Sequence, residues 1–222
     1  MEKIHIYFMP GLAAGPKIFE NLVFNESLYE LHFLKWVQPL TINESISNYA
    51  ERLANEVKQK NIVLVGVSFG GIMVQEMSKF LKPKKIIIIS SVKSNLEFPK
   101  RFKLASASKL YKLFPTKIVS DFESFKRFFL GKSLKKKAKI YEKYLSERNE
   151  MYLKWSIYNV LHWQQTEVPS NITHIHGTND LVFPITNISN AIKIEKGTHI
   201  MIITKAKKIS RIIHEKLSAL SD

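Results

Sequence analysis

The sequence NIVLVGVSFGG, residues 61–71, decides the fold of this chain because it joins an apolar run to a serine flanked by glycines. Residues 62–67 are almost all apolar and mostly β-branched, which is typical of a strand buried on both faces of a sheet. Apolar residues then recur at helical spacing after Ser68 until Pro83, a residue type that ends helices. The stretch therefore predicts a strand over 62–67, a tight turn at Ser68 and a helix over 69–81.

The turn at Ser68 places special demands on its neighbours. A serine held between a strand and a helix needs small residues two positions before and after it, because side chains there would collide with those elements. Gly66 and Gly70 occupy both positions. The hydroxyl would project above the sheet beside the first N–H groups of the helix, which can stabilise a developing negative charge. Ser68 is therefore a candidate nucleophile, with an ordinary glycine-rich turn as the alternative.

Strand and helix patterns alternate along much of the remaining chain. Apolar runs predict further strands at 4–8, 31–37, 86–89, 172–176 and 191–194. Amphipathic spacing predicts helices at 16–23, 46–57 and 209–217, and Asn43 or Ser45 can cap the second of these. The alternation predicts an α/β fold: a doubly wound, mainly parallel sheet of about six strands with helices on both faces.

The alternation stops between residues 93 and 167, where only helical patterns occur. Amphipathic pieces fall at 102–113, 122–130, 138–145 and 151–163, and Met151, Trp155, Tyr158 and Leu161 predict the buried stripe of the last piece. A length of 222 residues is compatible with one domain. We expect a single domain over 1–222, with a core of residues 1–92 and 168–222 and a helical insertion of residues 93–167 over the carboxyl edge of the sheet.

Composition limits the location and the chemistry. The chain has no cysteine, which excludes disulfides, cysteine nucleophiles and thiolate metal ligands and fits a reducing compartment. Residues 4–14 superficially resemble a signal peptide, but His5 and Pro10-Gly11 interrupt the apolar run, so we predict a first strand and a cytoplasmic protein. No apolar run approaches the roughly 18 to 20 residues of a membrane helix, so we predict no membrane span.

Positive charge is concentrated in the predicted insertion. The chain has 34 basic and 19 acidic residues, a net of +15, and residues 93–154 hold 17 basic against 6 acidic, a net of +11. Such a balance favours an anionic substrate or an acidic partner. Nucleic acid is not the partner we expect, because the basic residues lie among helical pieces and no recognised nucleic-acid motif is present.

Three residue types needed for serine catalysis follow predicted strands. In an open parallel sheet, active residues gather at the carboxyl ends of strands. A serine becomes a strong nucleophile when a histidine takes its proton, and a carboxylate must hold that histidine. Ser68, Asp180 and His199 supply the three groups. Asp180 could instead stabilise its own turn, and His199 could cap the last helix.

Other titratable residues offer weaker alternatives. Glu97 is a fallback acid because it follows the strand predicted at 86–89. His174 and His176 share one face of a predicted strand and could form a metal site with Asp180, but no third convincing ligand accompanies them, so we predict no metal and no cofactor. The remaining histidines carry no interpretable pattern: His5, His32, His162 and His214.

Three motifs resemble the α/β-hydrolase family in the order that family uses. GVSFG (66–70) is similar to its nucleophile elbow, HGTNDLVFP (176–184) to its acid loop and KGTHI (196–200) to its histidine loop. The resemblance runs from Ile4 to the final helix. It implies a triad of Ser68, Asp180 and His199, a cap formed by the middle segment, and the absence of the N-terminal hairpin of larger members.

The resemblance also implies an oxyanion hole formed by the backbone N–H groups of Phe69 and Leu12. The sequence departs from the family pattern here, because many members have His-Gly after the first core strand and this chain has Met9-Pro10-Gly11-Leu12.

The motifs favour an intracellular serine hydrolase that cleaves a small carboxylic ester or thioester through an acyl-enzyme intermediate. Its partner would be a small acyl substrate, and the basic insertion suggests an anionic one. Two alternatives stay open: a noncatalytic binding module that uses the basic insertion as its partner surface, and a cofactor-free lyase or acyltransferase of the same fold.

Overall fold

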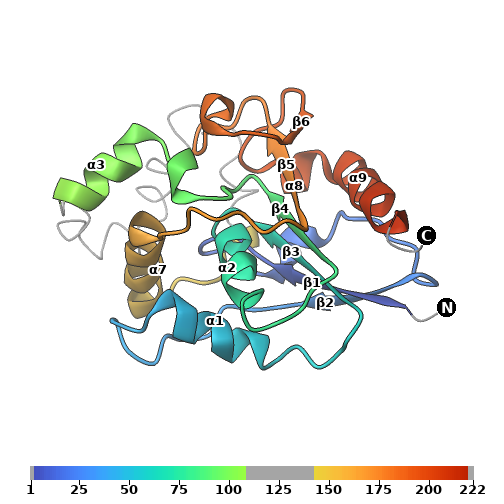
Figure 1. Ribbon diagram of the computed structural model, residues 1–222, viewed down its shortest axis with the longest axis horizontal. Coiled ribbons are helices and arrows are strands. Elements are labelled where there is room, and N and C mark those ends of the chain that lie inside the picture. The colour runs from blue at the N-terminus through green and yellow to red at the C-terminus, as the bar shows by residue number, and fades with distance from the viewer. Residues whose placement is uncertain (1–2, 109–142, 220–222) are drawn as a thin grey trace.

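A single parallel sheet organises the protein (Figure 1). The structure is a computed structural model that describes residues 3–108 and 143–219. The sheet order is β2-β1-β3-β4-β5-β6, and every neighbouring pair is parallel. The strands are β1 (Ile4–Met9), β2 (Tyr29–Phe33), β3 (Ile62–Val67), β4 (Lys85–Ile89), β5 (Ile172–Gly177) and β6 (Ile192–Ile194). The predicted α/β fold class is confirmed.

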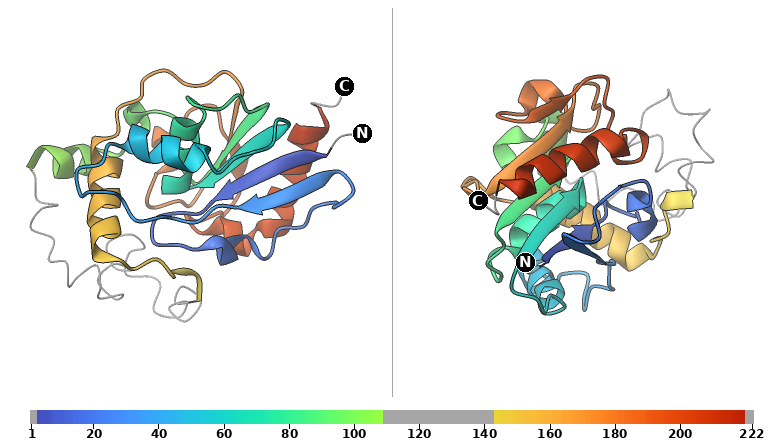
Figure 2. Two further views of the ribbon diagram at one scale, coloured as in Figure 1. Left: turned by 90° about the horizontal axis from the view of Figure 1, so that it is seen from below. Right: turned by 90° about the vertical axis from the view of Figure 1, so that its right-hand side faces the viewer.

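Helices cover both faces of the sheet (Figure 2). One face packs against α1 (Ile46–Ala54) and α2 (Phe69–Met77). The other face packs against the short 3-10 helix η1 (Pro16–Phe19) and the helices α8 (Met201–Thr204) and α9 (Ala206–Ser218). Ser45 caps α1 as predicted, because its hydroxyl accepts the Asn48 N–H at 3.1 Å.

The central strand β3 is buried on both faces, which explains its unbroken apolar run. Ile62 and Leu64 belong to the core under α1 and α2, whereas Val63, Val65 and Val67 belong to the core under α8 and α9. All six residues of β3 are buried. Burial of this kind contributes about 25 cal/mol for each Å² of apolar surface removed from water, so the two buried faces of β3 stabilise the fold.

Two boundaries differ from the sequence prediction because side chains draw the chain out of regular structure. The strand predicted at 31–37 ends at Phe33, and the Trp36 indole N–H then donates to the Gly11 carbonyl oxygen at 2.9 Å. The helix predicted at 16–23 is wrong beyond η1, because the Val23 N–H donates to Ser210 Oγ at 2.9 Å instead of continuing a helix.

The remaining helices also differ in their ends. α1 and α2 end at Ala54 and Met77, short of the predicted 57 and 81, and each is closed by a turn. The C-terminal helix begins at Ala206, and the short α8 that precedes it was absent from the prediction.

Within residues 93–167, the structure describes η2 (Asn95–Glu97), α3 (Lys100–Ser108) and α7 (Glu150–His162). The predicted helix at 122–130, residues 138–142 of the one at 138–145 and the run of lysines at 135–137 lie outside the described residues. The remaining short helix is η5 (Ile185–Asn187), which follows β5.

The buried stripe predicted for α7 is partly wrong. Trp155 is fully buried, but Tyr158 is 44% exposed and stacks on His162 with ring centroids 4.3 Å apart. The buried face instead runs through Tyr152, Leu153, Trp155, Ser156, Asn159 and Val160. Trp155 sets this rotation, because its ring stacks on Tyr49 of α1 at 4.1 Å and its indole N–H donates to the Glu44 carbonyl at 2.8 Å.

No helix within residues 3–108 and 143–219 has the length and apolar character that crossing a membrane requires.

Candidate active site

Ser68 lies at the turn between β3 and α2 in a backbone conformation that is uncommon for a non-glycine residue. Its φ is 54° and its ψ is −121°. Hydrogen bonds hold this conformation: the Ser68 N–H donates to the Ile89 carbonyl at 2.9 Å, and the Ser68 carbonyl accepts from Ser91 Oγ at 2.7 Å and from the Gly71 N–H at 2.9 Å. The surrounding backbone therefore supports the strain and fixes the direction of the hydroxyl.

The two predicted glycines are required by close backbone contacts. A Cβ on Gly66 would lie 2.2 Å from the Gly70 carbonyl oxygen. A Cβ on Gly70 would lie 2.3 Å from the carbonyl oxygens of both Met9 and Pro10. Gly70 thus lets α2 approach the end of β1, which brings the turn after β1 next to Ser68.

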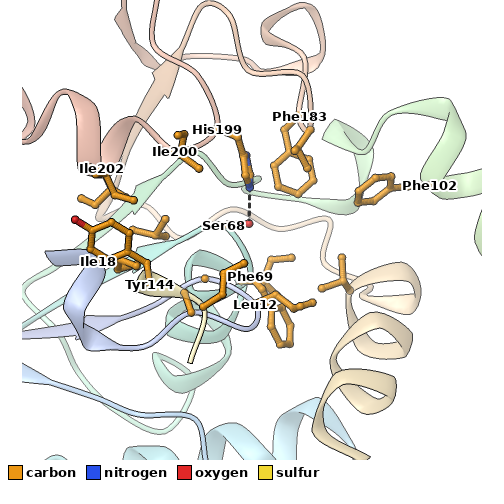
Figure 3. Close-up of a pocket in the computed structure, with 18 residues that line it drawn as sticks. Leu12, Ile18, Ser68, Phe69, Phe102, Tyr144, Phe183, His199, Ile200 and Ile202 are labelled. Atoms are coloured by element: carbon orange, nitrogen blue, oxygen red, sulfur yellow. Dashed lines mark hydrogen bonds between the residues drawn. The ribbon is translucent and has the colours of Figure 1, made fainter. Parts of the chain in front are cut away.

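A line of hydrogen bonds connects the three residues predicted as a triad. Figure 3 shows the part of it that joins His199 to Ser68. His199 Nε2 lies 2.9 Å from Ser68 Oγ. On the other side of the ring, His199 Nδ1 lies 2.9 Å from Asp180 Oδ2 and 3.2 Å from Asp180 Oδ1. The structure therefore brings together Ser68, Asp180 and His199, which are far apart in the sequence.

Two more glycines join the loops that carry Asp180 and His199. A Cβ on Gly177 would lie 2.3 Å from the Gly197 carbonyl oxygen, so these backbones meet without room for a side chain. The same Gly197 carbonyl accepts the Asn179 N–H at 2.8 Å. This contact sets the distance between the loop after β5 and the loop after β6.

Asp180 is held as an anion. Its side chain is fully buried, and Oδ1 accepts the N–H groups of Val182 at 2.8 Å and Phe183 at 3.0 Å. Burial alone would raise the pKa of Asp180, but the His199 ring and the Phe183 N–H outweigh it, so the pKa stays below its usual value. A charged carboxylate at this position fixes the Nδ1–H tautomer of His199, which leaves Nε2 free to take a proton.

A pair of buried histidines lies behind Asp180. His176 Nε2 lies 2.8 Å from the Phe183 carbonyl and 3.6 Å from Asp180 Oδ2, and His174 Nε2 lies 3.0 Å from His176 Nδ1. With a neutral His176 donating to Phe183, His174 donates to His176. His176 thus supports the loop whose N–H groups hold Asp180. The sequence placed both histidines on one strand face and allowed a metal pair with Asp180 only as the disfavoured interpretation. In the structure His174 Nε2 and both ring nitrogens of His176 take part in hydrogen bonds.

The fallback acid Glu97 lies in another network. Its carboxylate accepts the Lys93 N–H at 2.8 Å and the Ser189 N–H at 3.1 Å, and it lies 3.6 Å from Lys93 Nζ. The acid that contacts His199 in the structure is Asp180.

In the His174→Gln variant, the free energy of unfolding is expected to fall less steeply with decreasing pH than in the wild type. Burial, followed by His176 and Lys93, holds the pKa of His174 well below its usual value. In the unfolded chain His174 binds a proton near pH 6.5, whereas in the folded chain the ring stays neutral at that pH. The contribution of His174 to the free energy of unfolding is therefore complete above about pH 6.5. It falls as the pH decreases, by at most about 1.4 kcal/mol per pH unit for one histidine. Urea unfolding from pH 7.5 to 5 measures this slope.

Thr173, a buried residue of β5 that does not titrate, provides the control for that measurement. Thr173→Ser should keep the wild-type slope. An equal slope in His174→Gln and the wild type would contradict the assignment of His174 as a buried neutral group.

Phe69 and Leu12, the predicted oxyanion donors, both line the pocket that contains Ser68 (Figure 3). Phe69 is the first residue of α2, and the N–H groups of a first helical turn have no acceptor within their helix. The Gly11 carbonyl accepts from the Trp36 indole at 2.9 Å and from the Ala14 N–H at 3.0 Å. Because C=O and N–H of a trans peptide point in opposite directions, these bonds also fix the direction of the Leu12 N–H.

Trp36 is a site-supporting residue that sequence reasoning missed. It is 6% exposed and stacks almost parallel on Phe69, with ring centroids 4.9 Å apart. It therefore contacts both segments that carry the predicted donors. The only signal in the sequence was its apolar character, which was interpreted as part of a strand.

The described residues line a pocket of about 840 Å³, including the space at its open mouth. Ser68 and His199 lie in its wall, and most of the remaining lining is apolar (Figure 3). None of the described lining residues is Lys, Arg, Asp or Glu. The hydroxyl of Tyr144, another lining residue, donates to Glu20 at 2.7 Å.

Comparison by sequence gives no match, either to a protein-family model or to a curated protein. Comparison by structure gives many. An extracellular α/β-hydrolase from a Paenibacillus species has a TM-score of 0.63 and 16% identity, and the match covers 96% of this chain and 98% of that one. A structure from work on carboxylesterases of the thaumarchaeon Nitrososphaera gargenis has a TM-score of 0.69 and 15% identity, covering 99% and 92%. The enol-lactonase from Burkholderia xenovorans has a TM-score of 0.69 and 14% identity, covering 98% and 92%.

These similarities extend over nearly the whole length of each chain. They show that the protein has the α/β-hydrolase fold, as the three sequence motifs indicate. At 14 to 16% identity they concern the fold, and the chemistry must be argued from the site itself.

Proposed function

We propose that this protein is a serine hydrolase that cleaves carboxylic esters or thioesters through an acyl-enzyme intermediate on Ser68. The observation that carries the proposal is the unbroken line of hydrogen bonds from Asp180 through His199 to Ser68 Oγ. It lies in the wall of an apolar pocket, at the edge of the sheet where active sites of this architecture gather. The α/β-hydrolase fold and the esterase and lactonase names of similar structures agree with it.

In the first step, Ser68 Oγ attacks the substrate carbonyl carbon while its proton passes to His199 Nε2. The 2.9 Å separation of these atoms is suited to that transfer. Asp180 stabilises the imidazolium that forms and keeps the ring in position. His199 then gives the proton to the leaving alcohol or thiol, and the acyl group remains on Ser68.

The carbonyl oxygen becomes negatively charged during the attack, and backbone N–H groups stabilise it. Phe69, at the start of α2, supplies one donor. Leu12 supplies the second, because the hydrogen bond from Trp36 to the Gly11 carbonyl holds the peptide that joins Gly11 to Leu12. Removal of one such donor in other enzymes costs about 2.7 to 4 kcal/mol of transition-state stabilisation. In the second half of the reaction, His199 takes a proton from water while the water oxygen attacks the acyl carbon. The bond from that carbon to Ser68 Oγ then breaks, His199 returns the proton to Ser68 Oγ, and the carboxylic acid leaves.

We also propose that residues 1–92 and 168–222 form the catalytic core and that residues 93–167 form a cap over it. Phe102 of α3, Val160 of α7 and the pair Tyr144 and Leu145 all line the pocket beside Ser68. The cap therefore helps to select the substrate.

The described lining favours an apolar acyl group. Apart from Ser68, His199 and Tyr144, the lining consists of glycine, alanine, aliphatic residues and phenylalanine. The anionic substrate suggested by the charge of the cap lacks support in this lining. Ten of the 17 basic residues within 93–154 lie in 109–142, outside the described residues.

A series of neutral p-nitrophenyl esters from acetate to decanoate should show kcat/KM rising with acyl length before it levels off. Each buried CH₂ contributes about 0.8 kcal/mol, which corresponds to a gain of at most about fourfold per methylene. An anionic hemiester of matched length should be a poorer substrate than its neutral counterpart at low salt. A preference for acetate or for the anionic ester would contradict the apolar acyl pocket.

A pocket-filling variant sharpens this test. Ile203 lines the pocket and is only partly buried, so Ile203→Trp should shorten the preferred acyl chain without unfolding the protein. Leu40, which is 71% exposed and outside the lining, gives the control variant Leu40→Trp. The control should keep the wild-type chain-length profile.

The alternatives from the sequence give different results with the same esters. A noncatalytic binding module would release no product from any ester and would bind an anionic partner in a salt-sensitive manner. An acyltransferase would release the leaving group and pass the acyl chain to an added alcohol in preference to water.

A further inference from the structure

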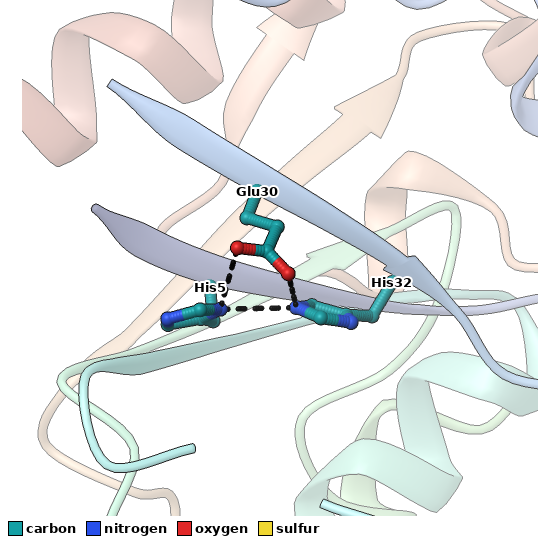
Figure 4. Close-up of side chains that lie close together, drawn as sticks. All are labelled: His5, Glu30 and His32. Carbon is teal, nitrogen blue, oxygen red and sulfur yellow. Dashed lines mark hydrogen bonds and ion pairs between the residues drawn. The ribbon is translucent and has the colours of Figure 1, made fainter. Parts of the chain in front are cut away.

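A cluster of two histidines and a glutamate lies on β1 and β2, outside the proposed active site (Figure 4). The parallel register pairs His5 with Glu30 and Tyr7 with His32. Paired residues of neighbouring strands point to the same face, as do residues two apart in one strand. The topology therefore gathers His5, Glu30 and His32 on one face, although 27 residues separate the two histidines in sequence.

The potential ligand atoms of the three side chains converge. His5 Nδ1 lies 3.0 Å from His32 Nε2, and the two nitrogens lie 3.7 and 3.6 Å from oxygens of Glu30. Ligands of a tetrahedral zinc ion, with bonds near 2.0 to 2.1 Å, lie about 3.3 Å from one another. An ion at the centre of the cluster would need only small rotations of these side chains.

We propose that His5, Glu30 and His32 bind a divalent transition-metal ion of the zinc class. Two imidazoles and one carboxylate are a ligand set that zinc accepts, with water in the fourth position. Among the described residues, this is the one group of three or more His, Cys, Asp or Glu side chains whose ligand atoms converge.

The surroundings suit a metal ligand. The Tyr7 ring stacks on His32 with centroids 4.4 Å apart and an interplanar angle of 11°, which holds the imidazole in one orientation. Glu30 is half exposed, with 50% of its side chain accessible, so ions can enter from solvent.

Without metal, the two rings share one hydrogen bond, in which one ring donates and the other accepts. Metal binding would replace that bond, and the donor ring would move its proton to its other nitrogen. Among the described strands, β2 lies at the edge of the sheet and pairs only with β1. The ion would therefore link the edge strand to the sheet and stabilise the folded chain, because it binds the folded and not the unfolded arrangement.

The site is separate from the proposed catalysis. His5 pairs with Ile62 near the amino end of β3, and Ser68 follows its carboxyl end. The six residue steps from Ile62 to Ser68 correspond to about 20 Å along a strand. Ester hydrolysis in chelator-treated protein should therefore be unaffected by changes in this cluster.

Calorimetric titration of the full chain with ZnCl₂ at pH 7.5, after tag removal and chelator treatment, tests the proposal. The wild type should bind one zinc ion per chain, and zinc should raise its Tm. His32→Gln and the half-exposed Glu30→Gln should bind at least about tenfold more weakly. Cobalt should show the visible absorption of a four-coordinate ion in the wild type and lose it in His32→Gln.

His214→Gln is the matched control, because His214 is an exposed histidine that also contacts a tyrosine, with Nδ1 2.8 Å from the Tyr29 hydroxyl. It should bind zinc like the wild type. Circular dichroism and the metal-free Tm check that each variant is folded. The proposal would be overturned if the wild type bound no stoichiometric zinc. It would also be overturned if folded His32→Gln and Glu30→Gln bound zinc with the affinity of the wild type.

Discussion

The Ser68→Ala variant is expected to lose ester hydrolysis by a factor on the order of 10³ or more in kcat/KM while remaining folded. The variant removes the atom that attacks the carbonyl, so His199 and Asp180 no longer have a nucleophile to activate. The change deletes one oxygen at the pocket wall and leaves the elbow hydrogen bonds intact, because these use the backbone of Ser68 and the hydroxyl of Ser91. Steady-state kinetics on the best ester of the acyl series measures the loss.

Ser78 supplies the control for this variant. It lies at the opposite end of α2, where its hydroxyl donates to the Gln75 carbonyl at 2.7 Å. Ser78→Ala should hydrolyse the ester at the wild-type rate. If Ser68→Ala kept more than about a tenth of the wild-type kcat/KM, the triad could not be the source of the activity.

The second large effect is expected on stability, in Gly66→Ala. The added methyl carbon would lie 2.2 Å from the Gly70 carbonyl oxygen and 2.5 Å from its carbon. Both contacts are with backbone, so β3 and α2 would have to separate. Overpacking of a core typically costs about 1 to 3 kcal/mol, and a backbone collision should exceed the upper end of that range. Urea unfolding and the yield of soluble protein measure the loss.

Gly11→Ala is the control, because it changes a glycine of the same site in the same way. Its methyl carbon would lie 3.4 Å from Ser68 Cβ and from the Val67 carbonyl oxygen, an ordinary van der Waals contact. The free energy of unfolding should change by less than about 1 kcal/mol. Equal stability of Gly66→Ala and the wild type would show that the close approach of β3 and α2 is not as described.

Much of the fold could be predicted because the strands are buried on both faces. β3 and β4 are apolar over nearly their whole length, and helical spacing separates them, so the parallel sheet was readable from pattern alone. The errors lie at the periphery. The strand predicted to reach Val37 ends at Phe33, because the hydrogen bond from Trp36 to Gly11 draws the chain away from the sheet. No local sequence pattern indicates a contact between those two segments.

The arrangement of Ser68, Asp180 and His199 was predictable because each residue follows a strand, and parallel strands end at one edge. The hydrogen bonds that hold the loop around Asp180 were not predictable. His176 and His174 occur on one strand face, but that pattern does not reveal their hydrogen bond to each other or the one from His176 to the Phe183 carbonyl. The converging nitrogens of His5 and His32 depend on the register of β1 with β2, which a single sequence does not reveal.

The rotation of α7 shows the same limit. Met151, Trp155, Tyr158 and Leu161 have helical spacing, yet a stripe shifted around the helix is buried. The contact of Trp155 with Tyr49 and Glu44 decides which face turns inward, and both partners come from a distant part of the chain. Apolar spacing alone allowed either rotation.

Covalent labelling tests the proposed nucleophile most directly. The full chain would be treated with a fluorophosphonate, digested with trypsin and analysed by tandem mass spectrometry. The proposed mechanism predicts one adduct, on the peptide of residues 61–79, with fragmentation assigning it to Ser68 and not to Ser78. Ser68→Ala should give no adduct. Labelling of Ser68→Ala at the wild-type rate, or an adduct on another residue of the wild type, would contradict the proposal that Ser68 is the nucleophile.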